Sequence, residues 1–135
     1  MYRFVAALIA GLAVAFPALA DVTGPARIVS LSSNASSRNF TLGQDKDFYD
    51  VRFKTTITDS NGLPSTAGPV KSLTSRLTHV VFTRDAMGLT VIFVNGEQVV
   101  SKIVGGDPGN WDAGHRLSLA NEISRDRPWL GQFYF

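Results

Sequence analysis

The acidic side chains could do hydrolytic chemistry, but their spacing argues against it. Retaining glycoside hydrolysis needs two carboxyl groups about 5–5.5 Å apart, and a strand supplies them from residues two positions apart, which share a face. The two glutamates, Glu97 and Glu122, lie far apart in the sequence. Asp45 and Asp47 have the required spacing, but they flank Lys46 in a polar segment typical of a turn. The sequence therefore predicts no catalytic residue.

Oxygen-bearing side chains gather instead around a glycine-rich loop, residues 105–114 (GGDPGNWDAG). Calcium takes six to eight oxygen ligands from carboxylates, amides, backbone carbonyls and water. Asp107 and Asp112 lie in this loop, and Asn121 ends the next expected strand, so the three could meet at one rim of a sheet. We expect these three residues to hold any bound calcium. The alternative is that they are turn formers whose side chains hydrogen-bond nearby backbone groups.

The same loop carries Trp111, whose ring could serve as a flat apolar platform for a sugar. Its neighbours Asn110 and His115 are then the expected polar ligand-binding residues. The alternative for Trp111 is a plug over the end of a sandwich core. The two histidines are isolated, which does not suggest a zinc site with three or four converging ligands; we expect His79 to be partly buried in a strand and His115 to be exposed.

The N-terminal segment has the pattern of a secretory signal peptide. A basic start with Arg3 precedes an apolar run over residues 4–20 that ends in Ala18-Leu19-Ala20, a small-residue exit typical of cleavage. We predict a signal peptide over residues 1–20 and one domain over residues 21–135. No later segment is apolar and long enough to span a membrane.

Charge and cysteine content limit the possible cellular location of the protein and the classes of molecule that it could bind. The formal net charge is +2, and opposite charges alternate along the chain, so nothing resembles the concentrated basic patch of a nucleic-acid binder. The chain has no cysteine, so disulfides and thiolate metal sites are excluded. An exported domain without disulfides favours a secreted, periplasmic or cell-envelope protein of a bacterium.

Alternating apolar and polar residues predict short strands and no long helix. The clearest signal is a three-strand meander over residues 77–101, in which Asn95-Gly96 between apolar runs predicts a tight hairpin. Further strands are expected at 26–32, 38–44, 48–56, 116–120 and 129–135. Together they indicate an antiparallel sandwich or barrel. Its expected core includes Phe53, Val81, Phe93 and Leu119.

Several motifs follow one another in an order that carries a family resemblance. They are RIVSLS at 27–32, RNFTLGQ at 38–44, VRFKTT at 51–56, HVVFTRD at 79–85, VIFVNGEQV at 91–99 and WLG at 129–131. In this succession the chain resembles the laminin-G-like domains of the concanavalin A-like lectin and glucanase superfamily. The resemblance implies an all-β, antiparallel jelly-roll sandwich that binds carbohydrate or extracellular proteins, in some members through calcium at the sheet rim. Strands normally precede the segment at 27–32 and one follows the WLG turn, so the resemblance also implies that outer strands are missing.

The leading hypothesis is a secreted, non-enzymatic binding or adhesion module that recognises carbohydrate. The second is a truncated β-sandwich piece that assembles with another β-sheet or chain through exposed edges. The third is a domain related to glycoside hydrolases. The first requires a folded monomer with a ligand site near Trp111, whereas the second expects a mature chain that is oligomeric or insoluble alone.

Overall fold

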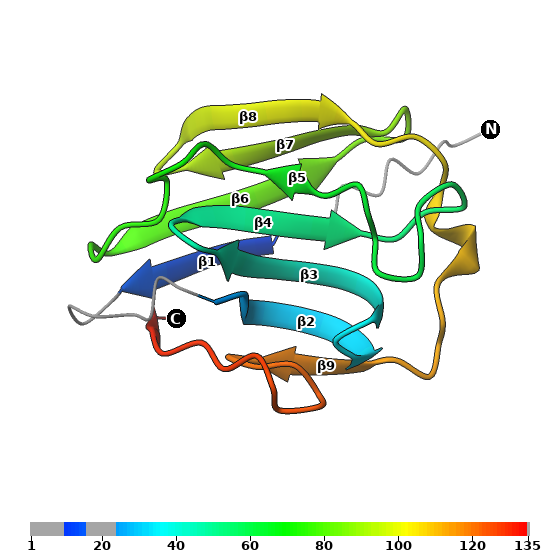
Figure 1. Ribbon diagram of the computed structural model, residues 1–135. Helices are drawn as coiled ribbons and strands as arrows, with labels where there is room; N and C mark the ends of the chain where they lie inside the picture. The colour runs from blue at the N-terminus through cyan, green and yellow to red at the C-terminus, as the bar shows by residue number, and fades with distance from the viewer. Residues whose placement is uncertain (1–9, 16–23, 135) are drawn as a thin grey trace.

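The computed structural model describes residues 24–134 and the backbone of residues 10–15. Two five-stranded antiparallel sheets face each other (Figure 1), which confirms the predicted sandwich. We call them sheet A, in the order β10-β1-β6-β7-β8, and sheet B, in the order β5-β4-β3-β2-β9. The strands are β1 (Ala10–Ala15), β2 (Ala26–Asn34), β3 (Ser37–Asp45), β4 (Phe48–Phe53), β5 (Thr66–Ala67), β6 (Thr78–Arg84), β7 (Leu89–Val94), β8 (Glu97–Ile103), β9 (Arg116–Leu119) and β10 (Gln132–Tyr134); a 3-10 turn, η1, covers Pro108–Asn110.

The predicted hairpin joins β7 to β8. Asn95 and Gly96 have φ values of 53° and 86°, and a two-residue turn of this kind requires positive φ at both positions. Asn95 also ties the turn to β6, because its side-chain oxygen and its backbone N–H bond the backbone of His79 at 2.9 and 2.8 Å. The three-strand meander over β6, β7 and β8 is therefore confirmed.

Aromatic rings from both sheets form the centre of the core. The ring centroids of Phe40 and Phe53 in sheet B lie 5.8 and 6.1 Å from that of Phe82 in sheet A. Phe82 is fully buried, and the other two rings are at most 8% exposed. Contacts at these distances add to the stabilisation that comes from burial of the rings. Phe53 was an expected core residue, and this prediction is confirmed.

The predictions for the other three expected core residues are wrong. Two of these residues are one position away from a buried residue, and the third lies in an edge strand. In sheet A, Val80, Phe82 and Ile92 are fully buried, whereas Val81 and Phe93 are only half-buried. Consecutive apolar residues put hydrophobic side chains on both faces, so alternation alone cannot say which face is inside. Leu119 is 48% exposed because β9 is the edge strand of sheet B.

Tyr49 gives a testable consequence of core burial. Burial raises the pKa of its phenol to about 12, above the value near 10 expected for an unfolded chain. The stabilisation from keeping the phenol protonated is thus complete below pH 10 and is lost as the pH rises towards 12, an effect of about 2–3 kcal/mol. We expect Tyr49→Phe to reduce the fall in free energy of unfolding between pH 9 and 11.5, measured by urea titration. Parallel pH curves for the two proteins would contradict this assignment.

The first strand lies inside the segment predicted to be a signal peptide. β1 pairs antiparallel with β6 from Ala10↔Phe82 to Val14↔Thr78, and with β10 from Ala13↔Tyr134 to Ala15↔Gln132. A strand thus precedes Arg27, and β10 follows the WLG turn and pairs with β1, so the expectation that outer strands are missing at these two places is wrong. Residues 1–9 and 16–20 lie outside the described part of the chain, so cleavage after Ala20 stays a prediction. Within the described residues, the structure contains no helix that is long and apolar enough to span a membrane.

Candidate functional site

The loop between β8 and β9 is fastened to one end of sheet B by side-chain hydrogen bonds. Trp111 Nε1 donates to the carbonyl of Lys54 at 2.8 Å, and Asn110 Nδ2 donates to the carbonyl of Thr55 at 3.0 Å. Asn39 in β3 bonds the backbone of Asp112 twice, as a donor at 2.8 Å and as an acceptor at 2.9 Å. These bonds hold the loop in one position although it has little regular structure of its own.

A hollow of about 310 Å³ opens between this loop and sheet B. Its walls are Leu31, Asn39, Trp111, Asp112, Ala113 and His115. An apolar surface with a few fixed polar groups is typical of small-molecule sites. The structure thus brings together three of the residues that the sequence singled out, Trp111, Asp112 and His115.

Trp111 combines the two roles that the sequence left open. Its ring centroid lies 5.0 Å from that of Phe53, at an angle of 50° between the planes, so part of the ring closes the end of the core. The side chain is nevertheless only half-buried, and it lines the hollow. The ring is therefore fixed in position while part of its surface stays accessible.

The histidines differ from expectation. The His115 side chain is only 3% exposed, and its Nε2 lies 3.8 Å from Asp112 Oδ2 and 3.4 Å from Ser37 Oγ. Its expected exposure is wrong because the loop folds back over β3 and encloses the ring. His79, expected to be partly buried, is exposed because it alternates along β6 with the core residues Thr78 and Val80.

The three candidate calcium ligands take part in separate turns. Asp107 Oδ1 accepts from the N–H of Gly109 at 2.7 Å, where it caps η1, and Asp112 Oδ1 accepts from the N–H of Gly114 at 2.8 Å. Asn121 lines a different hollow, of about 430 Å³, beyond β9. In the described part of the chain, no three acidic, histidine or cysteine side chains are grouped to hold a metal. Calcium binding at these residues therefore stays a prediction.

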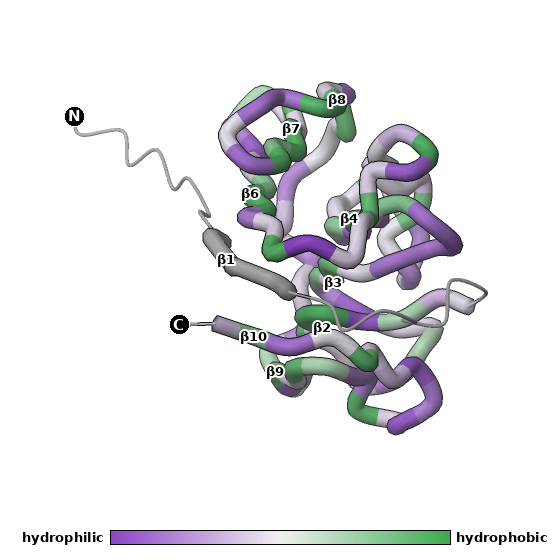
Figure 2. The backbone as a smooth tube through the Cα atoms, turned by 90° about the vertical axis from the view of Figure 1, so that its left-hand side faces the viewer, coloured by the Kyte–Doolittle hydropathy of each residue, from purple (hydrophilic) through white to green (hydrophobic). Residues whose placement is uncertain are grey.

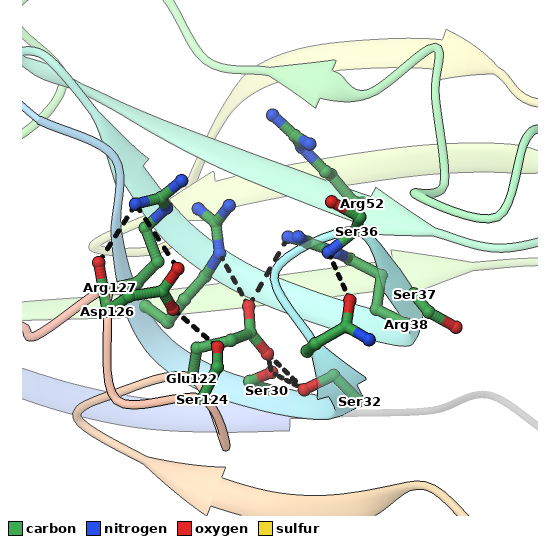
Figure 3. Close-up of polar contacts among 12 residues, drawn as sticks. Ser30, Ser32, Ser36, Ser37, Arg38, Arg52, Glu122, Ser124, Asp126 and Arg127 are labelled. Atoms are coloured by element: carbon green, nitrogen blue, oxygen red, sulfur yellow. Dashed lines mark hydrogen bonds and ion pairs between the residues drawn. The ribbon is translucent and has the colours of Figure 1, made fainter.

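A buried charge cluster lies on the opposite face of sheet B from the aromatic core. Its centre is Glu122, from the segment after β9, which is 1% exposed. Glu122 Oε2 lies 3.3 Å from Arg27 Nε and 3.7 Å from Arg38 Nη1. The hydroxyls of Ser30 and Ser32 both donate to Glu122 Oε1, and Figure 3 shows these side chains converging on the carboxylate.

The cluster contains more positive than negative charge. Arg38 is fully buried, and none of its guanidinium nitrogens has a hydrogen-bond partner. Burial is the main cause that lowers its pKa to about 10, followed by repulsion from Arg27. Burial likewise lowers the pKa of Arg27, with a second contribution from Arg52. Glu122 is therefore the carboxylate within ion-pair distance of both buried arginines, with a weaker contribution to Arg27 from Asp50.

Sequence reasoning missed Asn39, Arg27 and Arg38. Asn39 follows Arg38 directly, ahead of an alternating Phe40 and Leu42, so two adjacent polar residues at the start of a buried strand were the available signal. Arg27 and Arg38 likewise occupy strand positions, and arginine is rarely fully buried. Their partner Glu122 is 95 residues from Arg27, and alternation carries no information over that separation.

Comparison with known proteins agrees with this architecture. The family model described as the concanavalin A-like lectin/glucanases superfamily matches residues 15–134. A crystal structure from Bacteroides ovatus ATCC 8483, titled a "putative carbohydrate binding protein", matches with a TM-score of 0.62 and 20% sequence identity. The match covers 94% of this chain and 35% of that one, and at this identity it shows a shared fold. No curated protein matches the chain.

Proposed function

Because the chain belongs to the concanavalin A-like lectin/glucanases superfamily, we propose that it is a non-enzymatic carbohydrate-binding module. The observation that carries this proposal is the half-buried Trp111 ring in a hollow that also presents Asn39, Asp112 and His115. A fold alone does not determine a ligand, so the proposal depends on this hollow. The Bacteroides protein, named a "putative carbohydrate binding protein", supports the same ligand class.

The polar groups around the ring suit a sugar. A pyranose presents an apolar face to an aromatic ring and hydroxyls at its edge, so it needs both surfaces side by side. The side chain of Asp112 is 61% exposed. Its carboxylate, which already accepts from the N–H of Gly114, has room to accept a further hydrogen bond from a hydroxyl, while Asn39 holds the backbone of the same residue. The proposed ligand-binding residues are accordingly Trp111 and Asp112. The His115 ring is enclosed beside Asp112, and Asn110 is occupied in anchoring the loop.

The hollow supports binding better than hydrolysis. Asp112 is the single carboxylate among its lining residues, and glycoside hydrolysis in most families needs two. Glu122 is not available as the second carboxylate, because it is buried against sheet B, where it accepts hydrogen bonds from two serines and pairs with two arginines. We place the module outside the cytoplasm of a bacterium, consistent with the pattern of residues 1–20, with a glycan as partner and an extracellular protein as the alternative.

Asp112→Asn tests the site with little effect on the fold. Asparagine keeps the Oδ1 that accepts from Gly114, so the turn survives, but it removes the charge that strengthens a hydrogen bond to a hydroxyl. We expect glycan affinity to fall about tenfold, which corresponds to about 1.4 kcal/mol. The measurement is a screen of immobilised glycans followed by calorimetric titration of the best ligand, with calcium and with chelator.

Asp85→Asn is the matched control. Asp85 Oδ1 accepts from Met87 and Leu89 in the turn between β6 and β7, so it has the same structural role away from the hollow. We expect unchanged glycan affinity in this variant. Equal affinity of the Asp112→Asn, Asp85→Asn and unmodified proteins would refute the proposed site, and a dependence on calcium would extend it to a metal.

A further inference from the structure

The position of β1 gives the N-terminal segment a structural role. β1 lies between β6 and β10 in the strand order of sheet A, so it is an inner strand of that sheet. Figure 2 shows the strands β6, β7 and β8 of sheet A on one side and β4, β3 and β2 of sheet B on the other. Among the described strands, β10 pairs with β1 and with no other. Without residues 10–15, β10 would therefore lose its attachment to the sheet, and β6 would become an unpaired edge.

The sequence of the segment fits this position. The register pairs Leu12 with Val80 and Val14 with Thr78, and both partners are buried. The small residues Gly11 and Ala13 pair with Val81 and His79, on the outer face of β6. Ala10, Leu12 and Val14 thus occupy the register of the buried residues of β6, and Gly11 and Ala13 occupy the register of its outer face. An inner strand needs this alternation, whereas an export leader needs only apolarity.

We propose that the gap between β6 and β10 is a strand-acceptor site whose occupant is residues 10–15 of this chain. A chain cut after Ala20 then keeps the two-sheet fold only while this segment stays in the gap. The predicted cleavage and the fold are in this way coupled, because the residues that resemble a leader also complete the sheet. An added strand of this kind gains affinity from backbone hydrogen bonds and specificity from alternate side chains.

The removal of the segment exposes more than an edge. Val80 and Phe82 in β6 are fully buried, and their backbone partners are Leu12 and Ala10. Phe133 in β10 packs on Trp129, with ring centroids 4.8 Å apart, and it is aligned with Val14. An unpaired edge with buried apolar neighbours is a site for pairing with another strand, so the gap is specific for an extended apolar segment.

The test uses the whole chain, made in a membrane-free translation system so that no signal peptidase acts on it. A protease recognition sequence inserted after Ala20 allows the protein to be cut while folded. We expect the fragment that carries residues 10–15 to stay with the rest of the chain in gel filtration, and the cut protein to unfold cooperatively. After the fragment is removed in denaturant, we expect residues 21–135 to lose this transition and to regain it with a lysine-flanked peptide of residues 10–15.

Two variants distinguish the effect of strand pairing by residues 10–15 from the effect of the apolar character of the whole segment. Ala13→Pro removes one backbone donor from an inner strand, which a sheet does not tolerate, and we expect Tm to fall by more than about 10 °C. Ala18→Pro changes the same apolar segment beyond β1, and we expect Tm to change little. A peptide with Ala13→Pro should not restore residues 21–135. An unchanged Tm in the Ala13→Pro chain, or a dimer of residues 21–135 with the Tm of the whole chain, would overturn the assignment.

Discussion

Glu122→Gln is expected to destabilise the protein by about 3–5 kcal/mol. The substitution keeps the size of the side chain but removes the charge that compensates Arg27 and Arg38, which are 2% and 0% exposed. Loss of one partner from a buried ion pair leaves an uncompensated charge in a medium of low polarity, and this cost exceeds the value of the pair itself. Since small domains are stable by only about 5–15 kcal/mol, the change should be obvious in a urea titration at neutral pH.

Arg38→Met in the same cluster should have a much smaller effect, within about 1 kcal/mol. It removes a buried cation none of whose nitrogens has a hydrogen-bond partner, and it leaves Arg27 and Glu122 as a balanced pair at 3.3 Å. Replacement of a buried charge by an apolar side chain of similar volume is often neutral or stabilising. Both substitutions keep about the same volume, so a large difference between them reports charge and not packing.

Asp126→Asn is the surface control for Glu122→Gln. Asp126 lies 3.7 Å from Arg127 in an ion pair whose side chains are 46% and 35% exposed. Exposed pairs of this kind contribute about 0–1 kcal/mol, so we expect a change of less than about 0.5 kcal/mol. A Glu122→Gln protein as stable as the Asp126→Asn protein would show that the two arginines do not need the carboxylate.

The fold was predictable where the decisive signals are local. Asn95-Gly96 between two apolar runs determines a hairpin through φ alone, and Tyr49, Val51 and Phe53 alternate with polar residues strictly enough to fix the inner face of β4. In β6 the same method failed, because Val80, Val81 and Phe82 are apolar at three consecutive positions. Which of the two faces is inside then depends on the facing sheet, which no window of sequence contains.

The candidate site was predictable in part, for a related reason. Trp111, Asp112 and His115 belong to one loop, so their proximity follows from the chain itself. The burial of His115 and the anchoring by Asn39 depend on contacts across 73 to 78 residues, and these contacts have no local pattern. The N-terminal segment shows a different limit: apolarity is equally suited to a leader and to a strand, so composition alone left its place in sheet A unrecognised.

Gly131→Ala is the second substitution with a large expected effect, of about 3 kcal/mol. A Cβ at this position would overlap Cζ2, Cη2 and Cε2 of the Trp129 ring. Trp129 is 4% exposed and packs on Phe133, so its ring has no space to move into without disturbance of the core. Overpacking of a filled core typically costs about 1–3 kcal/mol, and overlap with three ring atoms places this change at the upper end. Urea titration gives the free energy of unfolding.

A double-mutant cycle tests whether the Trp129 ring is the cause of the destabilisation by Gly131→Ala. Phenylalanine at position 129 lacks the indole atoms that the new methyl group would meet, so Gly131→Ala should cost less in the Trp129→Phe protein, with an interaction energy of at least about 1 kcal/mol. Gly24→Ala is the control, because a Cβ there meets nothing within 4 Å, and we expect a change of less than about 0.5 kcal/mol. Additive costs for Gly131→Ala and Trp129→Phe would locate the destabilisation in the backbone of the turn. An interaction energy of the expected size would instead show that the cost comes from contact with the Trp129 ring. The short turn before β10 then requires a residue without a side chain at position 131, because the ring packs directly against it.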